Sequence, residues 1–253
     1  MTNSTIVEYI WIDKQIQSKT RVIYEIVYDL FDIPNLTINR LGDEIIIKPI
    51  KLFKCPFRKS PNLIVLCDTY TSSMVPLNNN YRYDAIIVFD KYINQNPWFS
   101  FEQEYDANVD AAEEHLQACL YAEIKISSSD SKMFGVGPLE GIDAADQLWM
   151  ARFIMEKIAK QHRITINWLG LCSIKFSTEL MRATNGLNII LSSIEKLHNI
   201  DQISNCGIGN YNQPIRIPQL VINDKSGYFE DRRPIADSNP YQTTANLLEI
   251  TMK

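Results

Sequence analysis

Cysteine is scarce in this chain, and no two cysteines stand at a spacing typical of a metal or redox site. There are five, an odd number, and they are scattered with no CxxC pair. This pattern favours neither a disulfide framework nor a zinc site, so we interpret them as ordinary thiols. They are Cys55, Cys67, Cys119, Cys172 and Cys206.

The chain also lacks long apolar runs and any stripe of basic residues. No apolar stretch reaches membrane-spanning length, and the first residues lack the basic end and apolar core of a signal peptide. We therefore expect a soluble cytoplasmic protein with no membrane association. The net charge is −5, with Lys and Arg interleaved among acids, which argues against a nucleic-acid partner and favours small molecules or proteins.

What is present is an ordinary globular composition in 253 residues, 45% of them hydrophobic and 22% charged. The first seventy residues contain four runs rich in β-branched and aromatic residues, each of strand length. These runs predict a small sheet domain over residues 1–80, which ends in the polar, turn-prone stretch 72–80. The predicted strands are 8–14, 22–31, 44–51 and 63–70.

From Tyr81 onward the apolar residues recur with helical spacing, and short strand-like runs separate the helices. This pattern predicts an α+β domain over residues 81–253. The predicted helices are 82–96, 109–124, 141–163 and 178–197, the last interrupted at Asn185 and Gly186. The predicted strands are 99–105, 166–170 and 215–222.

Two acidic residues stand out in the run PWFSFEQEY, Pro97–Tyr105. Glu102 and Glu104 are two apart on a predicted strand, so both side chains leave the same face. Neighbouring carboxylates repel unless a cation lies between them, and Mg²⁺ or Mn²⁺ favour oxygen ligands. The alternative is a strand face that is acidic, exposed and without function.

A second polar run, GYFEDRRP, covers Gly227–Pro234. Glu230 offers a third carboxylate, and Arg232 offers a planar charged fork for a carboxylate or phosphate. Arg216, in the run IRIP, taken alone is more typical of a surface ion-pair partner. The alternative is a solvated turn with local salt bridges, which stabilise weakly.

Taken together and in this order, several runs resemble the eukaryotic-type glutamine synthetase family. They are PWFSFEQEY, GPLEGIDAADQLWMARFI, NWLGLCSIKFST and GYFEDRRP. The resemblance implies a β-grasp-like N-terminal domain and a larger catalytic α+β domain, whose curved antiparallel sheet is backed by helices. It implies ATP-dependent ligation of ammonia to L-glutamate through a γ-glutamyl phosphate, with Mg²⁺ or Mn²⁺, in a homo-oligomer or a hetero-oligomer with a complete synthetase.

The same resemblance implies roles for individual residues. The metal ligands are Glu102, Glu104 and Glu230. The ATP-binding residues are Glu102, Phe176, Ser177, Arg216, Tyr228, Phe229 and Glu230. The glutamate-binding residues are Asn167, Trp168 and Arg232, and Arg232 is also the catalytic residue.

The chain departs from the family pattern at several of its functional positions. Met133 and Ser173 fall where the family has metal ligands, and Tyr211 falls on an arginine position. No counterpart of the glutamate flap lies between Leu197 and Cys206, and LTINRLGDE replaces the N-terminal loop that completes a neighbouring subunit's site. The stretch 127–138 is shortened, which predicts lost strand length at the centre of the sheet.

These departures leave two hypotheses. Phosphoryl transfer depends on positioning and on metal ions that neutralise charge, so missing ligands predict impaired or absent activity and weak or lost metal binding. The chain is then a non-catalytic homologue that binds or modulates a complete synthetase. In the other hypothesis it is a working ligase, with ligands supplied by Asp130, Asp110 or a partner subunit.

Overall fold

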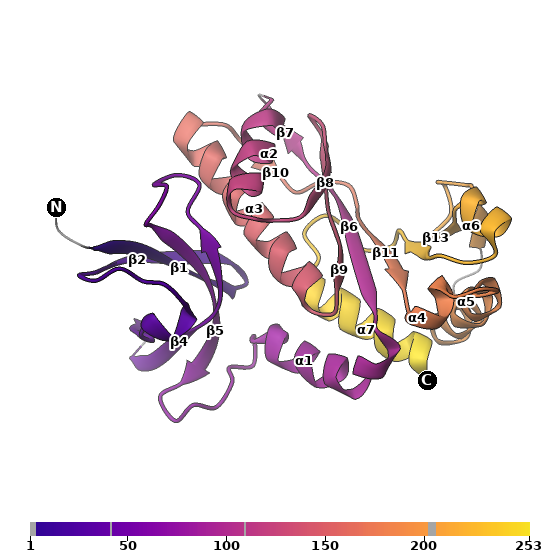
Figure 1. Ribbon diagram of the computed structural model, residues 1–253, viewed down its shortest axis with the longest axis horizontal. Helices are drawn as coiled ribbons and strands as arrows, with labels where there is room; N and C mark the ends of the chain where they lie inside the picture. The colour runs from indigo at the N-terminus through magenta and orange to yellow at the C-terminus, as the bar shows by residue number, and fades with distance from the viewer. Residues whose placement is uncertain (1–3, 41, 109, 202–205) are drawn as a thin grey trace. The chain divides into compact units, whose positions relative to one another are not determined.

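The structure is a computed structural model that describes residues 4–40, 42–108, 110–201 and 206–253 (Figure 1). The chain divides into two compact units. The first comprises Met1–Asp84 with Gln117–Ile124, and the second comprises Ala85–Leu116 with Lys125–Lys253. Nothing in the sequence pattern around residues 117–124 indicates that this segment belongs to the first unit.

The first unit contains a five-stranded mixed sheet with the order β2-β1-β5-β4-β3. Strands β1 and β5 are parallel, and the other neighbours are antiparallel. The elements are β1 (Thr5–Asp13), β2 (Gln15–Ile23), the 3-10 helix η1 (Leu30–Asp32), β3 (Leu36–Arg40), β4 (Asp43–Lys54) and β5 (Leu63–Thr71).

The core of this sheet follows from alternation along its strands, because successive side chains point to opposite faces. Val7, Tyr9 and Trp11 of β1 are buried together with Ile47 of β4 and Val65 of β5. Apolar residues on one face of three neighbouring strands thus form one continuous core.

The predicted strand 22–31 is wrong, because the chain leaves the sheet after Ile23. Asp29 caps the following 3-10 helix by accepting a hydrogen bond from the backbone N–H of Phe31, and Asp32 accepts bonds from two further backbone groups. These hydrogen bonds stabilise a turn where the sequence alternates like a strand.

The second unit is built on a seven-stranded mixed sheet with the order β12-β13-β14-β11-β6-β9-β8, beside a two-stranded sheet of β7 and β10. Only β12 and β13 pair in parallel, which corrects the expected all-antiparallel sheet. The strands are β6 (Trp98–Glu104), β7 (Asp106–Ala107), β8 (Ile126–Ser129), β9 (Met133–Glu140), β10 (Ile166–Asn167), β11 (Cys172–Ser177), β12 (Cys206–Ile208), β13 (Ile215–Ile217) and β14 (Phe229–Asp231).

The predicted helices are present; α3 packs along β9 and β6, and α7 packs against α3 and α5 (Figure 1). Helix α3 is buried along most of its length, from Ala144 to Met155, and is exposed at Asp143 and in its last turn. The helices are α1 (Tyr81–Lys91), the 3-10 helix η2 (Ile93–Gln95), α2 (Ala112–Tyr121), α3 (Asp143–His162), α4 (Glu179–Arg182), α5 (Leu187–Asp201), α6 (Gln219–Asp224) and α7 (Pro240–Met252).

Two further expectations about the second sheet are corrected. The shortened stretch 127–138 forms the hairpin of β8 and β9 at the edge of the sheet, and β9 still pairs with β6 from Trp98 to Glu104. The predicted strand 215–222 ends at Ile217, because Pro218 begins the helix α6. The centre of the sheet is therefore intact.

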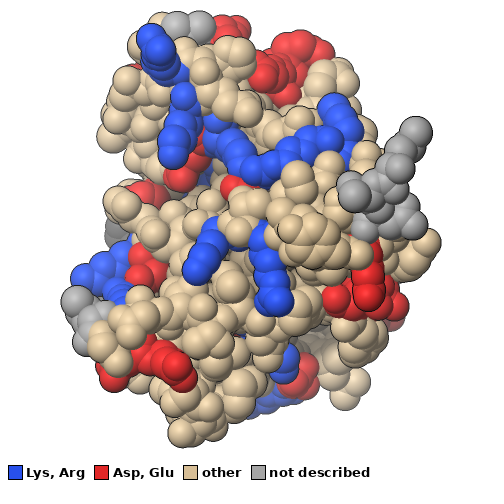
Figure 2. Space-filling model, turned by 90° about the vertical axis from the view of Figure 1, so that its left-hand side faces the viewer, with Lys and Arg blue, Asp and Glu red and all other residues tan. Residues whose placement is uncertain are grey.

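The surface is unevenly charged. Figure 2 shows one face on which Lys and Arg side chains form a band, while Asp and Glu lie mostly toward its margins. The net charge of −5 thus conceals a local excess of positive charge on this face. Within the described ranges, no helix combines the length and apolar character needed to cross a membrane.

Candidate functional site

Strand pairing in the second unit gathers charged side chains on one face of the sheet. Glu102 of β6 lies opposite Ser173 of β11, and Lys175 lies opposite Glu230 of β14. Glu230 in turn lies opposite Arg216 of β13. Because directly paired residues share a face, these five side chains lie on a single polar face of the sheet.

Lys175 occupies the centre of this group. Its Nζ lies 2.5 Å from Glu102 Oε1, and both side chains are about one quarter to one third exposed. Burial lowers the pKa of Lys175, but the hydrogen bond to Glu102 and the charges of Glu102, Tyr228 and Glu230 outweigh it, so the net pKa is raised. The ammonium is therefore held in its charged form between two glutamates.

Glu230 is paired with Arg216 in a more buried position. Arg216 Nη1 lies 2.6 Å from Glu230 Oε1, and the two side chains are 10% and 3% exposed. The other carboxylate oxygen, Oε2, has no hydrogen-bond partner among the residues that the structure describes. The guanidinium of Arg216 also lies 3.8 Å from the ring centroid of Tyr211, at cation–π distance.

Glu104 is engaged by the backbone. Its Oε2 accepts a hydrogen bond of 2.9 Å from the N–H of Leu171, and its own N–H donates to the Leu171 carbonyl. Gly170 has φ +90°, and a Cβ there would collide with the Glu104 carboxylate. Glu104 therefore fastens the loop that leads into β11, and the loop needs glycine at this position.

Met133 and Ser173, at positions where the resemblance implies metal ligands, lie beside Glu104 and Glu102. Met133 pairs with Glu104, as Ser173 does with Glu102. A thioether is a poor ligand for Mg²⁺ or Mn²⁺, which favour oxygen donors. Asp130 does not supply an oxygen ligand in place of Met133, because its carboxylate accepts hydrogen bonds from the backbone N–H groups of Lys132 and Met133 in its own turn. Asp110 likewise accepts from the first backbone N–H of α2.

The carboxylates of this face do not fit a divalent cation. Among the described residues, no group of three His, Cys, Asp or Glu side chains is placed to hold a metal ion. The chemistry agrees, because Glu102 and Glu230 are each neutralised by a basic side chain and Glu104 is hydrogen-bonded to the backbone. The donor set is that of an ion-pair network.

Three residues assigned to ligand binding lie on the other side of the sheet. Phe176 and Phe229 are fully buried and pack edge-to-face, with ring centroids 5.6 Å apart. Trp168 packs edge-on against Phe134, and its Nε1 donates to Glu156 of α3 at 3.1 Å. These rings contribute to the core and the helix side, so only the backbone of Phe176 and Phe229 is left for a nucleotide.

The remaining candidate residues lie around the edge of the polar face. Ser177 accepts a 2.9 Å hydrogen bond from Arg182, and Tyr228 has a raised pKa because it is partly buried. Arg232 donates from Nε to the Tyr211 carbonyl at 3.1 Å, and Asn167 is exposed in β10. The structure thus brings together Glu102, Arg216 and Glu230. Arg232 lies near them, with its guanidinium 5.2 Å from the Tyr211 ring centroid that Arg216 also contacts.

A groove lies next to the Glu104 end of the polar face. It has a volume of about 550 Å³ and is lined by Glu104, Tyr105, Asp106, Asp130, Met133 and Leu169, among others. This volume is within the range of small-molecule pockets, about 300 to 1,000 Å³. A ligand in this groove would meet one carboxylate of the former ligand set.

Lys175 is the residue that sequence reasoning missed. Lys175 lies in the run NWLGLCSIKFST, two residues after Ser173. The family motif that this run resembles has asparagine at that position. Strand alternation alone places Lys175 on the face of Ser173, and hence toward the glutamates. The available signal was a charged residue inside an otherwise matching motif, two positions from Ser173.

Comparisons with known proteins concern the chain as a whole. A protein of Acanthamoeba polyphaga mimivirus, provisionally named a glutamine synthetase, is 36% identical over 97% of this chain and 93% of its own length. The glutamine synthetases of Agaricus bisporus and Homo sapiens are 31% and 30% identical, over 97% and 96% of this chain and 92% and 89% of their own lengths.

The alignment with the mimivirus protein extends over 330 positions, although the chain has 253 residues, so this chain lacks internal segments that the relative has. The crystal structure of a novel glutamine synthase homolog matches all of this chain and 82% of its own with a TM-score of 0.72 and 10% identity, which shows a shared fold. No protein-family model matches. The identities over nearly the whole length show that this shortened chain belongs to the glutamine synthetase family.

Proposed function

We propose that this chain is a non-catalytic member of the glutamine synthetase family, which acts by binding a complete synthetase. One observation carries the first half of the proposal. The two glutamates that share the polar face are neutralised by basic side chains of the same sheet, Glu102 by Lys175 and Glu230 by Arg216.

The physical reason is electrostatic. A divalent cation bound to Glu102 would lie within about 4 Å of the Lys175 ammonium. At an effective dielectric constant of about 20, the repulsion between a single and a double charge at that distance is about 8 kcal/mol. Lys175 would have to move away, and Met133 and Ser173 offer little in return. Without metal ions, the charge that develops in phosphoryl transfer is not neutralised.

The second half of the proposal is supported by exposed aromatic residues in the first unit. Tyr24, Tyr28 and Phe31 are 81%, 85% and 97% exposed, and they lie between β2 and β3. The capping box of Asp29 and Asp32 fixes the turn that carries Phe31. Exposed aromatic side chains in one short segment are typical of a protein-binding surface. Family active sites form between subunits, so such a surface can place this chain beside a complete one.

The finer architectural and ligand assignments belong to the same proposal. We take the first sheet as β-grasp-like, with the domain boundary near residue 80, and the second unit as a shortened catalytic domain. Residual ATP binding, through Tyr228 and the groove beside Glu104, would be weak because Arg216 and Ser177 already have partners within the protein. L-glutamate and ammonia would be bound only by the complete subunit.

A working ligase is the second candidate, and one observation favours it. Glu230 Oε2 is buried without a hydrogen-bond partner among the described residues, as an oxygen that awaits a ligand would be. Because Asp130 and Asp110 are committed to their own backbone turns, the missing ligands would have to come from a partner subunit.

The proposal is tested by calorimetry of the purified chain with Mn²⁺, a glutamyl-hydroxamate transfer assay on the same sample, and mass photometry of the chain mixed with a complete family enzyme. We expect no Mn²⁺ binding below about 1 mM, no transfer activity, and mixed oligomers. The matched variants are Phe31→Ser, which should lose the mixed oligomers, and Ile87→Ser, which changes another exposed apolar side chain.

Transfer activity of the chain alone would favour the ligase. Activity that arises only in mixtures, and is lost with Glu102→Gln in this chain, would also favour the ligase, with the partner completing the site. Absence of mixed oligomers would remove the binding half of the proposal while leaving the non-catalytic half intact.

A further inference from the structure

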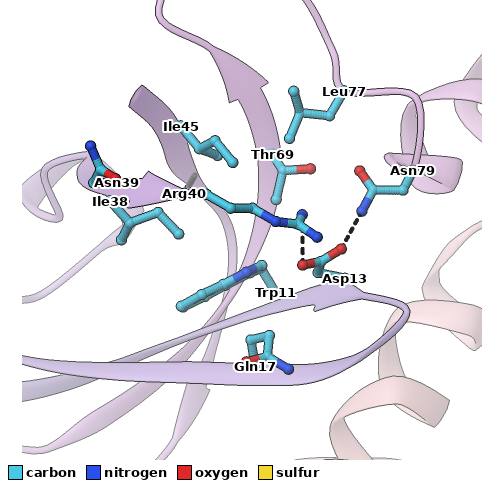
Figure 3. Close-up of a pocket in the computed structure, with 10 residues that line it drawn as sticks. All are labelled: Trp11, Asp13, Gln17, Ile38, Asn39, Arg40, Ile45, Thr69, Leu77 and Asn79. Carbon is cyan, nitrogen blue, oxygen red and sulfur yellow. Dashed lines mark hydrogen bonds and ion pairs between the residues drawn. The ribbon is translucent and has the colours of Figure 1, made fainter. Parts of the chain in front are cut away.

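A separate cavity of about 230 Å³ lies on the sheet of the first unit (Figure 3). Its lining comes from all five strands and from the segment after β5, which contributes Leu77 and Asn79. None of these residues belongs to the family-derived site of the second unit. The cavity therefore needs its own explanation.

A charged pair spans one side of the cavity. Arg40 reaches across it toward Asp13, with Nη1 2.6 Å from Oδ2, and Asn79 donates to Asp13 Oδ1 at 2.7 Å (Figure 3). The carboxylate of Asp13 can accept further hydrogen bonds, and the guanidinium of Arg40 has further N–H groups. No other lining residue is charged, so the lining as a whole is neutral.

The hydroxyl of Thr69 is a second, independent observation. Thr69 is 4% exposed, and its Oγ1 has no hydrogen-bond partner among the residues that the structure describes. Figure 3 shows it beside the end of Arg40, between Leu77 and Asn79. Buried hydroxyls are almost always hydrogen-bonded, so one left without a partner on a cavity wall marks a place for a polar ligand atom.

The rest of the wall is apolar. Trp11, Ile38, Ile45 and Leu77 line it, and Trp11 is also part of the buried core of the sheet. A volume of about 230 Å³ is below the range of about 300 to 1,000 Å³ found for pockets of drug-sized ligands. The ligand must be small, with an apolar part and at least one polar end.

We propose that this cavity binds a free α-amino acid with an apolar side chain. The ammonium would donate to Asp13 and Thr69, the carboxylate would accept from Arg40, and the side chain would lie against the apolar wall. A zwitterion keeps the cavity neutral and matches both charged groups with charge-assisted hydrogen bonds. An anion or a cation would bring a net charge into a half-buried site, which is unfavourable.

This inference does not rest on the proposed function, because it concerns a different unit and no catalytic step. It adds an amino-acid site to the N-terminal sheet. The test is calorimetry of the whole chain with L-leucine and with two analogues that each lack one charge, 4-methylpentanoate and 3-methylbutylamine. We expect L-leucine to bind at least about tenfold more tightly than either analogue, since each loses hydrogen bonds to a charged group.

Charge variants turn this preference into a prediction of selectivity. Asp13→Asn leaves a net positive cavity and should favour 4-methylpentanoate over L-leucine. Arg40→Gln leaves a net negative one and should favour 3-methylbutylamine. A purely structural role for the pair predicts loss of stability in both variants, with no exchange of ligand preference.

Thr69→Val gives a third test with a matched control. It removes the unpartnered hydroxyl at constant shape, so the chain should remain folded while L-leucine binds about tenfold more weakly. Thr37→Val, on an exposed position of β3 outside the cavity, should leave binding unchanged. Absence of L-leucine binding at about 10 mM, tighter binding of adenosine than of L-leucine, or equal effects of the two valine variants would each overturn the proposal.

Discussion

The two faces of the seven-stranded sheet differ in what holds their side chains in place. The helix-covered face carries fully buried rings, Phe99, Phe101 and Phe176, with centroids of the first and last 5.1 Å apart. The polar face carries ion pairs that solvent partly reaches, such as Lys175 with Glu102. Close packing constrains the residues of the helix-covered face, whereas only charge balance constrains those of the polar face. Residues of the polar face can therefore be substituted, with a change in binding chemistry, while the fold persists.

Even the polar group on the covered face is bound more tightly than those on the polar face. Arg152 of α3 is 2% exposed and donates to Gln103 of β6 and to the carbonyls of Ala236 and Ser238. Burial lowers the pKa of Arg152, and nearby Cys172, Asp237 and Glu156 oppose this effect. This network ties a helix, a strand and the segment before α7 into one piece.

The largest expected effect comes from breaking that network. Arg152→Met should lower the free energy of unfolding by about 4 kcal/mol, because Gln103 Oε1 and the Ser238 carbonyl lose their donor and the Ala236 carbonyl loses one of two. Removal of a buried guanidinium offsets only part of this loss. Urea denaturation of the variant and of Lys160→Met, an exposed position on the same helix, provides the measurement. A loss below about 1 kcal/mol would show that the covered face does not depend on this clamp.

A second test uses pH on the same covered face. His115 is fully buried and hydrogen-bonds to the Ala151 carbonyl at 3.0 Å, and burial lowers its pKa from 6.5 to about 4. The unfolded chain therefore takes up a proton first as pH falls. Stability from this group is complete above about pH 6.5 and is lost progressively down to about pH 4, by about 3 kcal/mol in total.

Unfolding free energies measured between pH 7.5 and pH 4 check this expectation. Other groups titrate in the same window, so the comparison is with His115→Gln, which keeps a donor but does not ionise. Between pH 7.5 and pH 4, the His115→Gln variant should lose about 3 kcal/mol less unfolding free energy than the unchanged chain. Parallel curves for the two proteins would contradict a buried neutral histidine.

The smallest effect on stability, and the sharpest on chemistry, is expected on the polar face. Lys175→Met should change the free energy of unfolding by less than about 1 kcal/mol, because the ion pair is partly solvated. It should also create Mn²⁺ binding, measurable by calorimetry and by the spectrum of bound Mn²⁺, since Glu102 is released and the repelling charge is gone. Lys175→Arg, which keeps the charge, should not bind. If the methionine variant also fails to bind, another feature blocks the site.

Much of the fold could be predicted, because helical and strand periodicities are local. Helices α1, α2, α3 and α5 and the strand β6 follow their apolar spacing. The end of the strand at Ile23 could not be predicted, because the aromatic residues of 22–31 alternate as in a strand. The hydrogen bonds that Asp29 makes as a helix cap outweigh this alternation. The start of α6 after Pro218 was also missed, although proline at a helix start is a known signal.

The candidate site was only partly predictable for a different reason. Motif resemblance singled out Glu102 and Glu230, and the structure shows that strand pairing brings the two onto one sheet face. It cannot say which partner each carboxylate takes, because that depends on the cross-strand register. The partner of Glu102 is Lys175, which lies on the neighbouring strand but 73 residues away in sequence.

The contact between Glu104 and Gly170 has a consequence for descent. The carboxylate binds the backbone at Leu171, and the glycine leaves room for it, so the two residues support each other as part of a folded loop. Selection for folding alone would then preserve Glu104, whatever else its carboxylate does. A sequence motif built on this glutamate therefore reports the architecture of the loop and not, by itself, an activity.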